Sequence, residues 1–354
     1  MKNIYLQVID KYVNNLPLAL ATVIKTMGSS PQKPGVSALF GPSGLVSGTI
    51  GGGVLEGKVQ KIAAKTIHLK ESGLYQFKLN KGISEKEEAI CGGQVSVLID
   101  TELEKSIAVL KEIRKSIIER TPGVFITLVK KSSGTRVFID RFWTDGKKEL
   151  PLQREYLIKI EPAISNMFQV TKPNDFREFE LSGPDEKPSV FCFLELVRPL
   201  PKLIIAGAGH IGKVVAQFGQ LLDFEVTVID DRPEFANSQN IPYADNIIVE
   251  DIGKAMQKIE KTSETYIVIV TRGHKDDSDA LKHCIGSGAS YLGMIGSKTK
   301  IAVMRKEFIK NGWATRDQWD EIFAPIGLDI KSQTVEEIAV SIAAQLIKIR
   351  NKER

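Results

Sequence analysis

The 354-residue sequence has no long apolar run, no internal repeat and no low-complexity tract. No segment reaches the roughly 18 consecutive apolar residues that a membrane-spanning helix requires. Nothing near Met1 resembles a secretory signal, which would begin with positive charge and continue with an apolar stretch. We therefore expect a protein without a membrane span, located in the cytoplasm.

Cysteine is also scarce. Cys91, Cys192 and Cys284 are odd in number and far apart, which argues against a disulfide framework or a Cys-x-x-Cys zinc site. The net charge of +5 is small, and the basic residues alternate with acidic ones. Because no basic stripe is interleaved with aromatics, we expect no nucleic-acid partner.

What remains is an ordinary globular composition, with 42% hydrophobic and 26% charged residues. The length allows two domains with separate cores. The segment Pro199-Leu200-Pro201 predicts a boundary, which divides the chain into an N-terminal domain, 1–199, and a C-terminal domain, 200–354.

The N-terminal domain mixes amphipathic and alternating patterns, which indicates an α/β (α+β) fold. The patterns predict helices and strands in this order: helix 4–15, strand 18–25, a hairpin of 36–40 and 45–50, helix 54–70, strand 94–99, helix 101–120, a hairpin of 123–130 and 136–140, and strand 190–197.

The C-terminal domain alternates strands with helices and reads as a Rossmann-like, doubly wound parallel sheet. Its strands LIIAG, EVTVID and YIVIV are continuous apolar runs, as expected when both faces of a sheet are covered. A final helix opens with the capping box that begins at Thr334.

The first strand of this domain ends in a glycine-rich loop that is typical of phosphate binding. Gly207 permits a tight turn, Gly209 lets the backbone approach a phosphate, and Gly212 allows close packing of helix and strand. His210 lies at the start of the helix, whose free N–H groups attract anions. Asp230 ends the next strand, where a carboxylate can bind a ribose hydroxyl.

Two alternatives stay open for this loop. The glycines would serve packing alone if no ligand binds. Arg232 leaves the choice between NAD and NADP open, because a guanidinium there either accepts a 2′-phosphate or simply faces solvent.

Two later turns of the C-terminal domain are further candidates. His274 follows the strand YIVIV, at the edge where ligands bind in open α/β sheets. Ser297 follows the next strand and begins a helix. A structural hydrogen bond for His274 and a plain helix cap for Ser297 are the alternatives.

The N-terminal domain has glycine turns of its own. Gly51, Gly52 and Gly53 join a strand to a helix, which suits a close approach to a ligand or another strand. Glu56 lies in the first helical turn, where a carboxylate also simply complements the helix dipole.

A second turn contains Cys91, Gly92 and Gly93 and leads into a strand. Cys91 is either a small buried residue or a soft ligand for a metal or a sulfur-bearing cofactor, and it is the only candidate metal ligand. The identity of any metal stays unknown.

Taken together, these motifs resemble the XdhC/CoxI family of xanthine dehydrogenase accessory factors. The resemblance rests on the runs Ser47–Gly57, Cys91–Gly93, Asp230–Pro233, Thr271–His274, Gly293–Ser297 and Ala324–Asp329.

The resemblance implies a cytoplasmic, homodimeric chaperone without turnover of its own. Such a protein binds molybdenum cofactor (molybdopterin), protects it during sulfuration and delivers it to a xanthine dehydrogenase-type molybdoenzyme. A cysteine desulfurase is the implied second partner. The glycine turns of both domains, Glu56 and Cys91 are implied to face the cargo.

Two residues depart from the family pattern. Gly53 stands where the family usually has cysteine, and Gln32 stands where it commonly has arginine. The first departure removes one soft ligand and leaves Cys91 alone. The competing interpretations are an NAD(P)-dependent oxidoreductase, with His274 and Asp277 as its best proton-transfer pair, and a non-catalytic dinucleotide-binding regulator.

Overall fold

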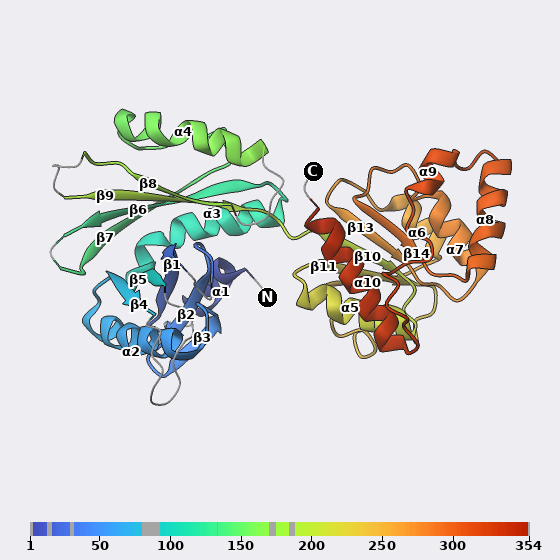
Figure 1. Ribbon diagram of the computed structural model, residues 1–354, viewed down its shortest axis with the longest axis horizontal. Helices are drawn as coiled ribbons and strands as arrows, with labels where there is room; N and C mark the ends of the chain where they lie inside the picture. Colours follow the sequence, from blue (N-terminus) through green and yellow to red (C-terminus); the bar gives the residue numbers. More distant parts are fainter. Residues whose placement is uncertain are drawn as a thin grey trace. The chain divides into compact units, whose positions relative to one another are not determined.

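The structure is a computed structural model that describes residues 3–12, 16–28, 32–79, 93–132, 134–169, 175–183 and 188–352. The chain forms two compact units, Lys2–Pro199 and Leu200–Arg354. Each is described below by itself (Figure 1). No helix in the described ranges is both long and apolar enough to cross a membrane.

The N-terminal unit contains two antiparallel sheets. The first has the strand order β3-β2-β1-β5-β4 and the second the order β7-β6-β9-β8. Their bounds are β1 Ala19–Met27, β2 Ser37–Gly41, β3 Gly44–Gly48, β4 Gly73–Lys78, β5 Gln94–Asp100, β6 Gly123–Lys131, β7 Val137–Thr144, β8 Phe176–Glu180 and β9 Val190–Val197.

Helices complete the core of this unit. Apolar side chains of α2 pack on the first sheet, and those of α4 pack on the second. Side chains of α1 and α3 pack with residues of both sheets. The bounds are α1 Ile4–Tyr12, α2 Gly53–Leu69, α3 Ile107–Ile118, which follows the 3₁₀ turn η1 Leu103–Ser106, and α4 Arg154–Gln169.

Three elements of this unit were absent from the sequence prediction, namely β4, α4 and β8. Pro162 lies inside α4, and proline ordinarily ends a helix. Ile160, Ile164 and Met167 nevertheless lie on one face and are buried against the second sheet. Tertiary packing therefore sustains this helix in spite of its proline.

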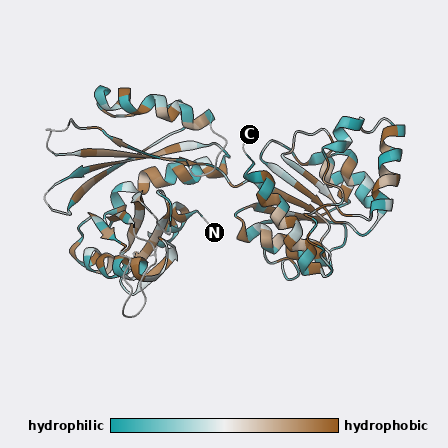
Figure 2. Cartoon of the chain, viewed as in Figure 1, coloured by the Kyte–Doolittle hydropathy of each residue, from teal (hydrophilic) through white to brown (hydrophobic). Residues whose placement is uncertain are grey.

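The C-terminal unit is a doubly wound parallel sheet, as predicted. Its order is β12-β11-β10-β13-β14, and all of its strand pairs are parallel. The bounds are β10 Lys202–Ala206, β11 Glu225–Asp230, β12 Asn246–Val249, β13 Thr265–Ile269 and β14 Tyr291–Met294. Figure 2 shows these strands as mainly hydrophobic, as burial of both faces requires.

Helices cover both faces of this sheet. Apolar residues of α5 and α10 pack in one core, and those of α6, α7, α8 and α9 pack in the other. The predicted capping box is confirmed, with Thr334 before α10 and Glu337 inside it. The bounds are α5 His210–Leu221, α6 Ile252–Lys258, α7 His274–Lys282, α8 Lys298–Lys310, α9 Arg316–Asp320 and α10 Val335–Arg350.

Candidate functional site

The strand order of the parallel sheet defines where a ligand is expected. From β10 the chain adds β11 and β12 on one side, and then β13 and β14 on the other. Ligands in open α/β sheets bind beyond the carboxyl ends of the strands at such a reversal. The loops after β10, β11 and β13 therefore form the candidate site.

The loop after β10 and the first turn of α5 contain three glycines in three different situations. A Cβ on Gly207, whose φ is +115°, would lie 2.4 Å from the carbonyl oxygen of Val270. A Cβ on Gly212 would lie 1.9 Å from the carbonyl oxygen of Gly207. A Cβ on Gly209 would meet nothing within 4 Å. Packing thus requires glycine at 207 and 212, whereas Gly209 faces open space.

Gly209 is also the N-cap of α5, and no side chain caps that helix. His210, the first helical residue, has an exposed side chain. The first N–H groups of a helix have no partner within it and form a positive dipole end. The start of α5 is therefore an open position for an anionic group.

Asp230, at the end of β11, bonds only to the protein's own N–H groups. Its Oδ2 accepts from Ala208 N at 2.8 Å and from Arg232 Nη2 at 2.9 Å. Its Oδ1 accepts from Arg232 N at 3.1 Å and from Arg232 Nε at 2.8 Å. The side chain is 2% exposed. The structure therefore gives Asp230 a bracing role between two loops rather than a free ribose-binding carboxylate.

The ionisation of Asp230 follows from these contacts. Burial alone raises the pKa of this carboxyl, but the hydrogen bonds from Arg232 and Ala208 outweigh burial and hold the pKa below its usual range. The Arg232 guanidinium stacks on Phe235, 3.9 Å from the ring centroid. Arg232 is therefore fixed by both charge and packing.

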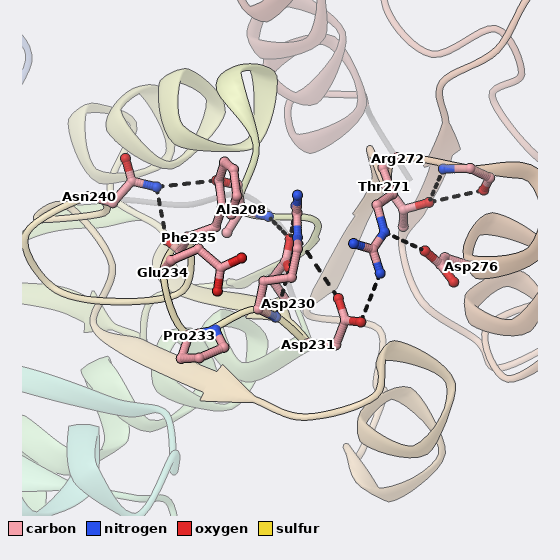
Figure 3. A network of polar contacts seen from close by, with 12 residues as sticks. Ala208, Asp230, Asp231, Pro233, Glu234, Phe235, Asn240, Thr271, Arg272 and Asp276 are labelled. Carbon is pink, nitrogen blue, oxygen red and sulfur yellow. Dashed lines mark hydrogen bonds and ion pairs between the residues drawn. The ribbon is translucent and has the colours of Figure 1, made fainter.

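A further ion pair joins the loops after β11 and β13 (Figure 3). Arg272 Nη2 donates to Asp231 Oδ2 at 2.9 Å, and Arg272 Nε lies 3.5 Å from Asp276 Oδ2. Sequence patterns did not single out Arg272 as an ion-pair residue. Its partner Asp231 lies 41 positions away, so no local spacing signals the contact.

The loop after β13 leads into α7, which Gly273 caps without any side-chain acceptor. Thr271 Oγ1 donates to the buried Asp277 at 2.6 Å, and Lys300 of α8 forms an ion pair with the same carboxylate. Burial raises the pKa of Asp277 in spite of these partners. The sequence did not predict that Thr271, Asp277 and Lys300 form a cluster. The ion pair in this cluster links α7 to α8.

His274 has a different partner. Its Nε2 lies 3.2 Å from Glu307 Oε2 of α8, and both side chains are partly exposed. Asp277 bonds Thr271 and Lys300 instead. The two members of the expected proton-transfer pair are therefore engaged separately.

Ser297 is the N-cap of α8, where its hydroxyl accepts from Lys300 N at 3.2 Å. This contact is an ordinary side-chain cap. The start of α8 differs in this respect from the starts of α5 and α7, where glycine leaves the N–H groups without a side-chain acceptor.

The first glycine turn of the N-terminal unit lies between β3 and α2. Gly51, Gly52 and Gly53 have φ values of 123°, 68° and 56°. Glu56 Oε2 accepts from Thr49 Oγ1 at 2.9 Å and from Ile50 N at 3.2 Å, so it braces the turn. A Cβ on Gly52 or Gly53 would meet nothing within 4 Å, and the turn presents bare backbone.

The second glycine turn is described only at its end. Gly93 is buried, and its carbonyl accepts from Leu79 N at 2.8 Å. Cys91 and Gly92 lie outside the described residues. Within the described ranges, no three histidine, cysteine, aspartate or glutamate side chains gather in a way that would hold a metal ion.

Comparison with known families matches both halves of the chain. A model described as the XdhC Rossmann domain matches residues 203–346, and one described as the XdhC and CoxI family matches residues 14–78. Together they cover more than half of the sequence.

Curated proteins and solved structures are similar to the chain. A protein of Bacillus subtilis (strain 168), named as a probable xanthine dehydrogenase subunit, is 24% identical over 336 residues, which is 94% of this chain and 93% of that protein. The uncharacterized protein YqeB of Escherichia coli (strain K12) is 26% identical over 170 residues, 48% of this chain. The matched part spans only 31% of YqeB.

One of the similar solved structures is described as a xanthine dehydrogenase from Bacillus halodurans. It has a TM-score of 0.76 at 24% identity, and the match covers 99% of this chain and 97% of that one. This similarity shows a shared fold across both units.

Proposed function

The chain belongs to the XdhC and CoxI family, and on that premise we propose that it is an accessory factor of a xanthine dehydrogenase-type molybdoenzyme. In this proposal its cargo is molybdenum cofactor, which it protects during sulfuration and delivers to the apoenzyme. A cysteine desulfurase is the proposed source of the sulfur, and the protein acts in the cytoplasm as a homodimer.

The observation that carries the proposal is the open start of α5. Gly209 leaves space in front of the helix, and no side chain satisfies the first N–H groups. Molybdopterin carries a phosphate, and phosphates bind at uncapped helix starts of this kind. We therefore assign the cargo phosphate to Gly209. The start of α7 at Gly273, which also has no side-chain cap, adds the positive end of a second helix dipole.

A moderate affinity suits a carrier, because the cargo has to leave again. A Kd of about 1 μM corresponds to about −8 kcal/mol. Helix-terminus contacts contribute roughly 0.3–1 kcal/mol each. They hold a phosphate without a deeply buried charge that would slow its release.

The contacts of His274 and Asp277 favour a carrier over an oxidoreductase. Glu307 engages His274 at a partly exposed position, and Lys300 with Thr271 engages the buried Asp277. A dehydrogenase that oxidises a hydroxyl group also has to move a proton, which a positioned acid or base does. These two side chains do not act on each other and provide no such pair.

The proposal is tested by reconstitution. Purified protein is loaded with molybdenum cofactor, separated from free cofactor, and mixed with a cofactor-free xanthine dehydrogenase. We expect activation of the dehydrogenase and no turnover of purines or small alcohols by the accessory factor alone. Steady NADH production by protein free of the dehydrogenase would refute the assignment.

Cys91 is the proposed soft contact for the cargo. Cys91→Ser replaces a soft donor by a hard one at nearly the same volume. We expect weaker cofactor retention and less activation, whereas Cys284→Ser, which removes a thiol buried in the C-terminal core, should change neither per folded molecule. Equal retention by wild type and Cys91→Ser would leave the phosphate and pterin contacts as the basis of binding.

A further inference from the structure

The edge of the parallel sheet that carries Gly209 also carries residues that decide which phosphate ligands fit. A carboxylate has two oxygens and about four acceptor positions. Arg232 and Ala208 fill all four positions of Asp230, two on each oxygen. No position remains for a hydroxyl group of a ligand.

This saturation matters because of where Asp230 lies. In dinucleotide-binding domains of this fold, the carboxylate at the end of the second strand binds the ribose hydroxyls of NAD. Here the Arg232 side chain makes those contacts instead. Hydrogen bonds between charged groups are among the strongest in proteins, so a ribose diol displaces Arg232 only at a large cost in affinity.

The charges around Arg232 disfavour a 2′-phosphate as well. The loops after β11 and β13 bring together more carboxylates than guanidinium groups, and both guanidinium groups are already paired. A 2′-phosphate would therefore find no unpaired guanidinium group beside Asp230. The carboxylates are Asp230, Asp231, Glu234 and Asp276, and the guanidinium groups are those of Arg232 and Arg272.

We propose that this edge of the sheet rejects dinucleotides and accepts a compact phosphomonoester, and that Arg232 is the residue that sets the choice. The start of α5 at Gly209 admits the phosphate, while the ribose position one strand away is filled by the protein itself. The identity of the compact ligand as a phosphorylated pterin rests on the proposed function.

The first experiment compares ligands on the wild-type full chain. NAD⁺, NADP⁺ and ADP-ribose are titrated by calorimetry, and neopterin monophosphate is titrated by its fluorescence, with unphosphorylated neopterin as its control. We expect neopterin monophosphate to bind at least tenfold more tightly than each of the other four compounds.

The second experiment removes the guanidinium. Arg232→Ala frees one acceptor position on each oxygen of Asp230 and leaves the main-chain N–H groups of positions 208 and 232 in place. One free position on each oxygen suits a ribose diol. We expect at least a tenfold gain in affinity for NAD⁺ and ADP-ribose and no gain for NADP⁺.

Arg305→Ala is the matched control, because Arg305 forms an exposed ion pair with Asp320 between α8 and α9. We expect its affinities to equal those of wild type.

Wild-type binding of NAD⁺ or NADP⁺ as tight as that of neopterin monophosphate would overturn the proposal, even if Arg232→Ala does not fold. No gain for NAD⁺ in a folded Arg232→Ala variant would equally remove Arg232 as the selecting residue. Neither result depends on activation of a dehydrogenase. A failure of the accessory role would appear in the reconstitution assay, with dinucleotide rejection and the gain in Arg232→Ala unchanged.

Discussion

Both units place glycines where a strand gives way to the first turn of a helix, but for different physical reasons. In the C-terminal unit, Gly212 is required because a Cβ would lie 1.9 Å from a carbonyl oxygen. In the N-terminal unit, Gly52 and Gly53 have open space around them but positive φ values of 68° and 56°. One turn is fixed by packing and the other by backbone conformation.

The difference shows what glycine clusters do at a binding surface. A glycine that packing requires holds a loop in place but offers nothing to a ligand. A glycine in open space, such as Gly52, Gly53 or Gly209, exposes backbone that a cargo or a partner can approach. Substitutions at the two kinds of position should therefore separate stability from binding.

Gly212→Ala should have the largest effect on stability. Its methyl group would overlap the carbonyl oxygen of Gly207, so helix and strand must move apart. We expect a loss of about 3 kcal/mol in the unfolding free energy of the C-terminal unit, measured by urea denaturation. Gly209→Ala is the control and, as an N-cap substitution, should lose about 1 kcal/mol or less. Equal stability of the two variants would contradict a packing role for Gly212.

The two units also differ in the pKa of one carboxyl group in each, Glu195 and Asp230. Glu195 of β9 accepts a hydrogen bond from Tyr5 and lines a cavity of about 20 Å³, room for about one water. Burial raises the pKa of Glu195 to about 7, whereas the pKa of Asp230 is lowered. A raised pKa means that the folded state binds the proton more tightly than the unfolded chain.

Wild type should therefore gain stability relative to Glu195→Gln as the pH falls from about 7 towards 4.5, the ordinary value for this carboxyl. The full difference is at most about 3 kcal/mol. The contribution of Asp230 has the opposite sign and is lost only in acid, below its ordinary pKa of 3.8.

Unfolding of wild type and Glu195→Gln at pH 8 and pH 5.5 measures the effect of Glu195. Glu112→Gln, at an exposed ion pair, serves as the control and should follow wild type. If the unfolding free energies of wild type and Glu195→Gln change by the same amount between pH 8 and pH 5.5, that result would contradict a raised pKa of Glu195.

Gly209→Val tests the open glycine of the C-terminal turn. Its φ of −72° suits any residue, and a Cβ meets nothing within 4 Å, so the core should be unaffected. The branched side chain would occupy the space in front of α5. We expect a loss of at least tenfold in affinity for neopterin monophosphate, about 1.4 kcal/mol, with little change in thermal stability. Unfolding without a change in affinity would make Gly209 a packing residue.

Gly53→Cys, which restores the residue usual in the family, tests the other kind of glycine. The backbone at Gly53 has a φ of 56°, which costs a residue with a side chain roughly 1 kcal/mol. We expect that loss in the N-terminal unit, together with stronger cofactor retention because the new thiol faces open space. Gly53→Asn, which tolerates this conformation better, should lose less stability and gain no retention.

Local sequence signals predicted much of the C-terminal unit. Three of its strands, LIIAG, EVTVID and YIVIV, are apolar runs, and Thr334 with Glu337 marks the last helix. In the N-terminal unit, the helix predicted over 101–120 is a 3₁₀ turn followed by α3, and β8 was missed. The sequence of β8, FREFE, has two aromatic residues among three charged ones and no strict alternation, and it lies in a polar, proline-bearing stretch. Pairing with β9 makes this segment a strand.

The amino-acid sequence by itself determined the family, the parallel sheet and the glycine loop of the candidate site, because these depend on residue types within a few positions of one another. Only the tertiary structure decided what Asp230 does. Its four acceptor positions are filled from Arg232, two residues away, and from Ala208, 22 residues away. The hydrogen bond from Ala208 forms only when two loops meet at the edge of the sheet. The bonds from Arg232 depend on how its side chain folds back, so no spacing along the chain encodes whether a carboxylate there is free or already satisfied.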